Sequence, residues 1–495
     1  MNRARFAASQ AAAGARVPRD YDALVVGAGP NGLAAAITLA RAGCSVLLLE
    51  GKAQIGGGAR TAELTLPGFH HDVCSAVHPL ALASPFFRQL PLEEHGLEWI
   101  HPPLPLAHPF DDGSAAILTR SLDDTAAGFG DDARAYYDLM HPLLSSFETL
   151  LPSLLAPLRL PRHPLPLARF ARNGLQPARK LAQTLFETHT ARALFAGLAA
   201  HSILPLERRP SAAFGLLLGL LGHSVGWPLP RGGSQRIADA LVAVLELLNV
   251  EIVRATRVDS LAALPSADAV LLDLTPRQIV RIASDSLPAK LLRKLARYRY
   301  GPGVCKLDLA LDGPIPWAHD ACVRAGTVHV GGSLEEIAQA ESEVWRGSLP
   351  ERPFVLVTQS SLFDPTRAPA GKHTAWAYCH VPHASGVDAS EHIERQIERF
   401  APGFRARILA RSVRTTSDLE HDNPNLVGGD INGGVQDLGQ LFTRPARLFD
   451  PYDLGPIHRS GVGNLFICSS STPPGGGVHG MNGYHAARSA LRYLG

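Results

Sequence analysis

The stretch Ala23-Leu-Val-Val-Gly27-Ala-Gly29-Pro30-Asn31-Gly32 decides the fold of this chain. Its first four residues form a short apolar run that predicts a buried strand. The Ala- and Leu-rich residues 31–42 predict a helix that ends at Gly43. The glycines between them have the spacing of a turn that holds a dinucleotide. The sequence therefore predicts a strand, a tight turn and a helix at the start of a nucleotide-binding fold.

The glycines of this turn have different tasks. Gly27 permits the tight turn, Gly29 lets the backbone approach a pyrophosphate, and Gly32 lets the helix pack closely on the strand. Pro30 and Asn31 open the helix, whose free amides and positive dipole end point at the phosphates. We predict that all five residues belong to a cofactor site.

An acidic residue follows at the position that adenosine binding requires. Residues 44–49 form a second apolar run, and Glu50 closes it, 18 residues after Gly32. Glu50 is placed to accept hydrogen bonds from both ribose hydroxyls, and it would repel a 2′-phosphate. The neighbouring Gly51 is predicted to belong to the same site. The complete strand–helix–strand unit spans about 30 residues, which favours a dinucleotide site over an accidental loop.

A second glycine cluster follows in Ile55-Gly-Gly57-Gly58-Ala59-Arg60-Thr61. Its lack of side chains leaves room for a long cofactor that crosses the fold. We expect Gly57, Gly58, Ala59 and Arg60 to contact that cofactor. The residues alone do not separate FAD from NAD at this point.

Composition excludes several classes of protein. The 495 residues suggest two or three domains, and 46% hydrophobic and 19% charged residues are ordinary for a globular protein. A net charge of +2 without blocks of like charge gives no case for nucleic acid. None of the six cysteines lies close to another in sequence, so neither a redox pair nor a zinc site is predicted. We expect a reduced, cytoplasmic protein without a bound metal.

The N-terminus and the remaining apolar runs indicate no membrane anchor. Residues 1–19 lack the apolar core of a secretory signal, and we interpret residues 1–20 as a flexible lead-in. An organelle transit peptide has a similar composition and is the alternative. The sequence contains no run of 18 apolar residues, so no span of a membrane is predicted.

Predicted elements alternate between two folds along the chain. Nucleotide-fold elements lie at the start, in the middle and at the end, whereas residues 80–227 read as short helices broken by prolines. Residues 306–311, 354–358 and 374–380 look like strands of a larger antiparallel sheet. We therefore predict an α/β protein with a discontinuous, glutathione-reductase-like Rossmann domain and an inserted substrate domain of antiparallel sheet plus helical lid. The first comprises residues 21–80, 228–300 and 455–495, and the second comprises residues 81–227 and 301–454.

Four segments carry a resemblance to a known family. Residues 25–61 look like the FAD motif of the amine-oxidase and phytoene-desaturase superfamily. Pro67-Gly-Phe-His-His-Asp-Val-Cys-Ser-Ala-Val-His-Pro79 and the C-terminal residues 465–480 resemble the phytoene-dehydrogenase-related oxidoreductases within it. Because residues 227–241 also match, the resemblance spans nearly the whole chain. It implies FAD as the cofactor.

The resemblance also implies further contacts with FAD. The N-terminus of the last helix would lie at the pyrimidine end of the flavin, which involves Val478, His479 and Met481. Val258 would offer its backbone to adenine. This chain departs from the family pattern twice. It has Gly58 where many members have arginine, and it has Ser470 where many members have a carboxylate, so that only a hydroxyl remains there.

Histidines are the candidates for proton transfer. His70, His71 and His78 follow the second glycine cluster and should run beside the flavin ring. His71 or His78 would accept a proton as hydride leaves the substrate, and the alternative is a histidine packed in the cofactor wall. His479 either touches the flavin edge or caps the final helix. The run Tyr378-Cys379-His380 resembles metal ligands, but neighbouring residues of a strand point to opposite faces, so chelation is not predicted.

The resemblance implies an FAD-dependent oxidoreductase that removes hydride from, or desaturates or isomerises, an apolar small molecule such as a polyene or lipid. The alternatives are an amine oxidase and an FAD-stabilised interaction or regulatory protein. A disulphide reductase is not favoured, because there is no cysteine pair. Dioxygen and a quinone are both open as electron acceptor, and homo-oligomerisation is left open. Residues 152–172 would form a helical lid or contact a membrane surface peripherally.

Overall fold

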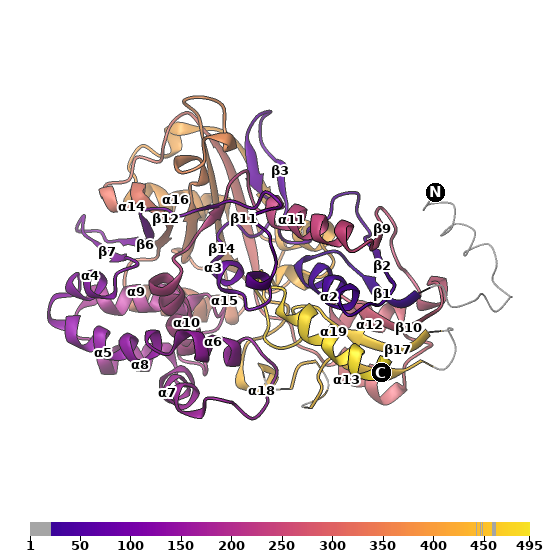
Figure 1. Cartoon of the computed structure of the whole chain (residues 1–495). Coiled ribbons are helices and arrows are strands. Elements are labelled where there is room, and N and C mark those ends of the chain that lie inside the picture. Colours follow the sequence, from indigo (N-terminus) through magenta and orange to yellow (C-terminus); the bar gives the residue numbers. More distant parts are fainter. Residues whose placement is uncertain (1–20, 442, 446, 448, 458–461) are drawn as a thin grey trace.

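The computed structural model describes residues 21–441, 443–445, 447, 449–457 and 462–495. The predicted flexible lead-in of residues 1–20, with its alternative as a transit peptide, lies outside the described residues. A six-stranded sheet and a cluster of helices occupy opposite ends of the molecule, and a seven-stranded sheet lies above these helices in the view of Figure 1. The predicted α/β class with a Rossmann-like part is confirmed, and the second sheet is antiparallel except for one parallel pair of strands.

The six-stranded sheet collects strands from distant parts of the chain. Five of its strands run parallel, and only the edge strand β16 is antiparallel to its neighbour. Their order across the sheet is β16 (Asp453–Pro456), β17 (Val462–Ile467), β10 (Ala267–Leu272), β1 (Tyr21–Val26), β2 (Val46–Leu49) and β9 (Glu251–Val253). Because β1 lies between β10 and β2, the turn that follows it sits at the middle of the carboxyl edge of the sheet.

Helices cover both faces of this sheet. On one face lie α2 (Pro30–Arg41), α11 (Gln235–Leu247) and α19 (Met481–Leu494), and on the other lie α12 (Pro276–Ile282) and α13 (Ala289–Ala296). In Figure 1 the last helix, α19, runs beside α2. Their contact is very close, because a Cβ on Gly483 would lie 1.8 Å from the carbonyl oxygen of Asn31. The start of the last helix is thereby fixed next to the start of the first.

The seven-stranded sheet has one apolar and one partly polar face. Its order is β15 (Ile408–Arg414), β11 (Gly303–Leu311), β14 (His373–Val381), β13 (Val355–Thr358), β12 (Ala325–Val330), β6 (Leu104–Pro109) and β7 (Ala115–Leu118). Alternate residues such as Cys305, Leu307 and Val357 pack in a core with α16 (Ser390–Phe400). The opposite face carries Lys306, Asp308, Trp376, Tyr378, Thr358, Thr327 and His329. The polar side chains therefore project from the face that is turned away from this core.

The segment predicted as helical contains three strands as well. β5 (Trp99–Ile100) pairs with β8 (Leu229–Pro230), whereas β6 and β7 extend the seven-stranded sheet, with β6 parallel to β12. Every residue of β6 is buried, and such a short buried run cannot be told from a helix by periodicity. The α-helices of this segment are α3 (Pro79–Ala83), α4 (Leu122–Ala127), α5 (Ala133–Leu144), α6 (Phe147–Leu154), α7 (Pro164–Gly174), α8 (Ala178–Leu185), α9 (His189–Ala200) and α10 (Ser211–Ser224).

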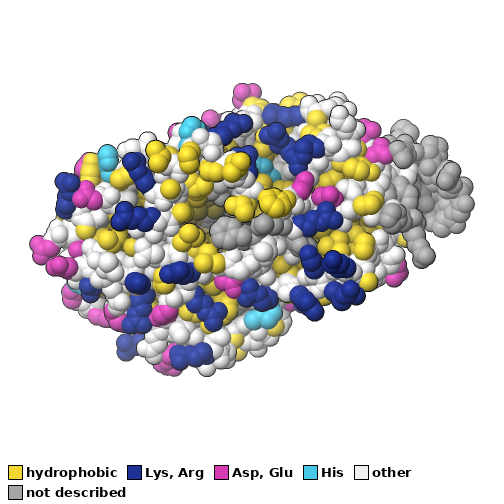
Figure 2. Space-filling model, turned by 90° about the horizontal axis from the view of Figure 1, so that it is seen from below, with side chains coloured by type: hydrophobic (Ala, Val, Ile, Leu, Met, Phe, Trp, Pro, Cys, Tyr) yellow, Lys and Arg dark blue, Asp and Glu magenta, His cyan; other side chains and the backbone are white. Residues whose placement is uncertain are grey.

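Within the described residues, every helix is too short or too polar to cross a membrane. The face in Figure 2 shows apolar side chains gathered near its middle, with Lys and Arg side chains around them and Asp and Glu interspersed.

Candidate functional site

A cavity of about 600 Å³ runs from the six-stranded sheet to the polar face of the seven-stranded sheet. At one end it is lined by the turn after β1, by Glu50 at the end of β2 and by Val258 after β9. At the other end it is lined by Lys306, Trp376 and other side chains of the large sheet. The cavity therefore joins the two folds.

At the end of the cavity formed by the glycine-rich turn, backbone segments lie very close to one another. Gly29 faces the segment of Gly57, because a Cβ on Gly57 would lie 2.9 Å from the Cα of Gly29. A Cβ on Gly32 would lie 1.9 Å from the carbonyl oxygen of Gly27, so a side chain there would separate α2 from the turn. Gly27, Gly29, Gly57 and the helix-opening Pro30 and Asn31 line the cavity, whereas Gly32 does not. Gly32 thus contributes by packing.

Glu50 is held rigidly at the edge of the cavity. Its Oε2 accepts a hydrogen bond from the Ala28 backbone at 2.8 Å, and its Oε1 accepts one from the Lys52 backbone at 2.9 Å. Gly51 and Val258 line the same end. Each carboxylate oxygen can accept further hydrogen bonds, so the geometry suits a diol such as the ribose of an adenosine.

Asp273, which directly follows β10, lies in this cradle and was not predicted. Its Oδ2 accepts a hydrogen bond from the Gly32 backbone at 3.1 Å, and a Cβ on Gly29 would lie 2.8 Å from it. Burial, together with the negative charge of the neighbouring Glu50, raises the pKa of this carboxyl to about 7, although the hydrogen bond from Gly32 opposes the shift. A titratable group therefore lies where the turn would hold phosphates.

Arg60 lines the cavity with a side chain that is already engaged. Its Nε donates to the Gly57 carbonyl at 2.7 Å, and its guanidinium forms an ion pair with Asp422, which also pairs with Lys52. Gly58 lines the cavity beside it, whereas Ala59 is buried away from the cavity.

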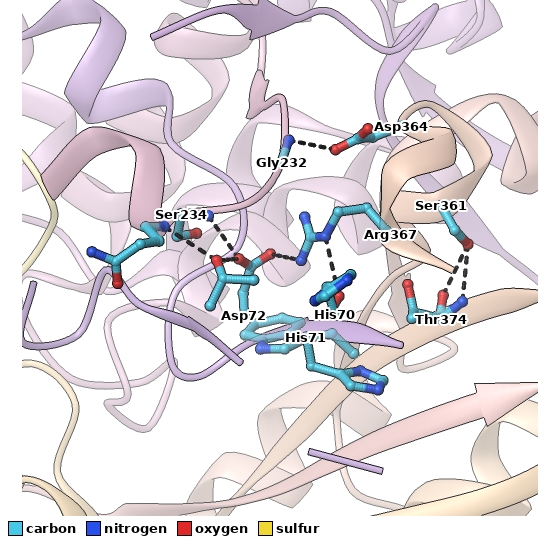
Figure 3. A network of polar contacts seen from close by, with 12 residues as sticks. His70, His71, Asp72, Gly232, Ser234, Ser361, Asp364, Arg367 and Thr374 are labelled. Carbon is cyan, nitrogen blue, oxygen red and sulfur yellow. Dashed lines mark hydrogen bonds and ion pairs between the residues drawn. The ribbon is translucent and has the colours of Figure 1, made fainter. Parts of the chain in front are cut away.

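A buried polar network supports the wall that carries the candidate histidines. It centres on Asp72 in the hairpin of β3 (Thr61–Glu63) and β4 (His70–Asp72) (Figure 3). Asp72 accepts hydrogen bonds from Arg367 at 2.8 Å, from the Ser234 backbone at 2.8 Å and from Thr61 at 2.9 Å. Although burial opposes ionisation, Arg367 and these donors lower the pKa of Asp72. The network thus fixes the hairpin against the segment before α11.

Of the two histidines predicted for proton transfer, only His78 lines the cavity. The hydroxyl of Ser234 donates to the Ser75 carbonyl at 2.6 Å, so it must accept from His78 Nε2, which lies 2.8 Å away. This leaves Nδ1 of His78 as the proton acceptor, and burial lowers the pKa of the ring to about 4. A neutral imidazole with Nδ1 as its acceptor nitrogen therefore lines the cavity.

His71 lies elsewhere. Its Nε2 is 2.8 Å from the Thr65 hydroxyl and its Nδ1 is 3.7 Å from Asp308, in the packed region behind the cavity. Burial lowers its pKa to about 3. The structure thus places His71 in the supporting wall, which was the alternative to a catalytic role.

The segment before the last helix contributes Ser470 and Val478 to the cavity. His479 and Met481 do not line it. Nδ1 of His479 accepts a hydrogen bond from the Met481 backbone at 3.0 Å, and the His479 carbonyl accepts one from Ser84 at 2.6 Å. His479 therefore caps α19, as in the second of the two predicted roles.

Lys306 was not predicted as a site residue. It is only 2% exposed, lines the cavity and forms an ion pair with Asp308, two residues along β11. Its Nζ lies 5.8 Å from the centre of the Trp376 ring, and the Trp376 indole donates to the Cys74 carbonyl at 3.0 Å. Burial lowers the pKa of Lys306. In the sequence, the two charged residues Lys306 and Asp308 within an otherwise apolar strand could have indicated this part of the site.

Comparison with known proteins agrees with this geometry. The NAD(P)-binding Rossmann-like domain family matches residues 25–90. The chain is 28% identical to pyridine nucleotide-disulfide oxidoreductase domain-containing protein 2 of Mus musculus, over 98% of this chain and 96% of that protein. It is also 37% identical to hydroxyneurosporene desaturase of Cereibacter sphaeroides over 137 residues, 25% of this chain and 27% of that one.

The chain is an oxidoreductase that is similar to the FAD-dependent superfamily of amine oxidases and phytoene desaturases. A solved structure of a redesigned putrescine oxidase has the same fold, with a TM-score of 0.58 and 16% identity over 96% of this chain and 98% of that one.

The cysteines of this oxidoreductase form no redox pair at the cavity. Cys74 lines the cavity, and all six cysteines are free. Cys305 and Cys379 are directly opposite each other on β11 and β14, which their sequence spacing could not reveal. Both thiols lie in the apolar core on the other face, where burial raises their pKa values. The geometry therefore offers no dithiol to a substrate in the cavity.

Proposed function

We propose that this oxidoreductase binds FAD along the cavity and removes hydride from an apolar substrate that lies against the polar face of the seven-stranded sheet. Residues 21–80, 228–300 and 455–495 would form the FAD-binding domain, and residues 81–227 and 301–454 would form the substrate domain. The observation that carries the proposal is the single cavity that joins the glycine-rich cradle to Lys306 and Trp376.

The cradle fits the ADP half of FAD. The N-cap of α2, Gly29, brings no capping side chain, so the helix start is open to an anion, and Glu50 is fixed for a ribose. The residues proposed to hold this half are Gly27, Gly29, Pro30, Asn31, Glu50, Gly51 and Val258, with Gly32 as a packing residue. A carboxyl at Asp273 is compatible with a pyrophosphate when it is protonated, which its raised pKa permits.

The rest of the cavity fits the flavin half. Gly57, Gly58, Arg60, Ser470 and Val478 are proposed to contact it, while Ala59, His479 and Met481 support it by packing. When bound, FAD supplies the hydride acceptor. The positive end of α19 would stabilise negative charge nearby.

Residues of the chain itself would handle the proton. His78 has a fixed tautomer with Nδ1 as acceptor, and this buried neutral ring can take up a proton from a substrate. Lys306 is a buried cation in the wall at the substrate end of the cavity, and Asp308 forms an ion pair with it. We propose His78 as the base and Lys306 as the group that orients the reacting end of the substrate.

The lining of the substrate end favours an apolar molecule over an amine. Leu80, Leu218, Val304 and Leu356 line it together with aromatic rings. A cationic amine would meet Lys306, whose charge repels it, while the nearby carboxylate of Asp308 is already paired with that lysine. The similarity to hydroxyneurosporene desaturase also supports a hydrocarbon-like substrate.

One experiment separates this function from that of an FAD-stabilised regulatory protein. The purified chain is denatured, the released cofactor is identified by mass spectrometry, and the intact protein is then titrated anaerobically with dithionite and with unsaturated hydrocarbon and amine substrates. The proposal predicts FAD that a hydrocarbon substrate reduces. Reduction by dithionite alone would favour the regulatory protein, and reduction by amines would favour an amine oxidase.

A further inference from the structure

The cavity contains polar atoms that the proposed function leaves without a role. The hydroxyls of Thr327 and Thr358 line the cavity and are 4% and 1% exposed, yet neither has a hydrogen-bond partner among the described residues. A buried hydroxyl without a partner is costly, so such groups normally bind a ligand or a water molecule. Val328 on β12 pairs with Val357 on the antiparallel strand β13. The neighbouring residues Thr327 and Thr358 are therefore also opposite each other, and both project from the other face of the sheet.

His201 lines the cavity at the same place. It follows α9, and its Nε2 lies 3.1 Å from Nε2 of His329, a residue of the same strand as Thr327. This contact occupies one ring nitrogen of His201, so Nδ1 is the nitrogen that remains for a ligand. Aromatic rings pack against the pair. The centre of the Trp227 ring lies 6.0 Å from the centre of each imidazole, and the centre of the Phe354 ring lies 5.2 Å from that of His329.

The two histidines are neutral together. Burial lowers the pKa of His201 to about 3 and that of His329 well below its ordinary value. One proton lies between the two facing nitrogens, because one of them must donate and the other must accept. Depending on which ring donates, Nδ1 of His201 presents either a hydrogen-bond donor or an acceptor to the cavity. The same site can therefore bind a hydroxyl or a carbonyl.

We propose that His201, Thr327 and Thr358 form a hydrogen-bonding site for an uncharged oxygen-bearing head group, a hydroxyl or a carbonyl, on an otherwise apolar substrate. This inference rests on the proposed function, because the apolar body would extend from the head group toward Lys306. An ionised head group is excluded, because the site offers it no counter-charge and its desolvation is costly.

The register of the sheet gives the length of this substrate. Asp308, Trp376 and Thr358 are direct cross-strand partners on β11, β14 and β13, and β12 is the next strand. With about 4.8 Å between neighbouring strands, the head-group site lies roughly 10 to 14 Å from β11. A main chain of roughly eight to eleven carbon atoms spans this distance, since each carbon adds about 1.25 Å.

Matched ten-carbon probes test the inference. FAD-loaded protein is titrated calorimetrically with geraniol and with its deoxy analogue 2,6-dimethyl-2,6-octadiene. Because loss of the hydroxyl leaves buried polar groups unpaired, we expect the hydrocarbon to bind at least about tenfold more weakly. Geranic acid and geranylamine at pH 8 should bind no more tightly than the hydrocarbon. Equal binding of geraniol and the hydrocarbon would overturn the inference.

Variants assign the preference to the named residues. In His201→Phe, and in the near-isosteric pair Thr327→Val with Thr358→Val, the preference for geraniol should fall below about threefold while FAD content is unchanged. His189→Phe, on the exposed first residue of α9, is the matched control and should keep the full preference. A preference that survives in both cavity variants refutes the site. A chain that lacks FAD but still prefers geraniol refutes the proposed function and leaves the head-group site supported.

Discussion

Replacing Asp273 with asparagine tests the cofactor cradle through its pH dependence. The carboxyl is buried against Gly32 and Gly29, and its pKa of about 7 means that it is half ionised near neutral pH. A pyrophosphate beside it would be repelled by the ionised form, so binding of FAD must take up a proton above pH 7. Asparagine has the same shape and still accepts the hydrogen bond from Gly32, but it carries no charge.

The magnitude follows from proton linkage. Uptake of one proton makes Kd rise about tenfold for each pH unit above 7, which amounts to roughly 100-fold, or about 2.7 kcal/mol, by pH 9. In Asp273→Asn, Kd should change less than about threefold over the same range.

The raised pKa of Asp273 also affects the stability of the folded chain. The contribution of Asp273 to the stability of the cofactor-free chain is fully present below about pH 4 and is lost as pH rises through 7.

The assay is fluorescence titration of FAD into the cofactor-free protein between pH 6 and 9. The reasoning is refuted if the wild-type Kd stays constant over this range. It is equally refuted if Asp273→Asn retains the tenfold slope, because the titrating group would then be another residue.

Four further changes give independent tests. Gly29→Val should abolish bound FAD and lower the melting temperature, because its side chain would meet Asp273 and fill the pyrophosphate site, and stoichiometric FAD in the variant would contradict the assignment. Glu50→Ala should weaken FAD binding by about 1.5–3 kcal/mol in the same titration, as loss of one charged hydrogen-bond pair does, whereas binding of FMN should not change. Lys306→Met should lower the free energy of unfolding, measured in guanidinium chloride, by about 3–5 kcal/mol, because it leaves the buried Asp308 carboxylate unpaired. The double variant Lys306→Met with Asp308→Leu should regain most of this free energy, because the unpaired carboxylate is then removed. Leu160→Asp with Leu165→Asp, at positions 94% and 71% exposed, should reduce sedimentation with anionic vesicles if residues 152–172 contact membranes, and unchanged sedimentation would leave the lid as their role.

Local pattern predicted the nucleotide end of the site well. The turn at Gly27 to Gly32, the strands around it and Glu50 all depend on contacts within about 30 residues, and periodicity and glycine spacing report such contacts directly. Asp273 was missed for the opposite reason. It reaches the turn only because β10 pairs with β1, and that pairing joins residues about 240 positions apart.

The substrate end of the cavity could not be predicted from the sequence without the register of the seven-stranded sheet. Lys306, Thr358 and Thr327 are polar residues on three different strands, and only their cross-strand pairing shows that they share one face. His71 and His78 show the same limit of prediction from sequence. Their sequence places His71 and His78 equally near the cofactor, but His71 turns into the packed wall while His78 lines the cavity.

The central claim is that one cavity holds FAD from the glycine turn to the face that carries Lys306. The most direct measurement is the visible spectrum of the purified chain during anaerobic photoreduction, together with the identity of the cofactor released on denaturation. We expect about one FAD per chain, with its absorbance bleached on reduction, and loss of that FAD in Gly29→Val. A chain that binds only NAD, or no dinucleotide at all after incubation with excess FAD, would contradict it.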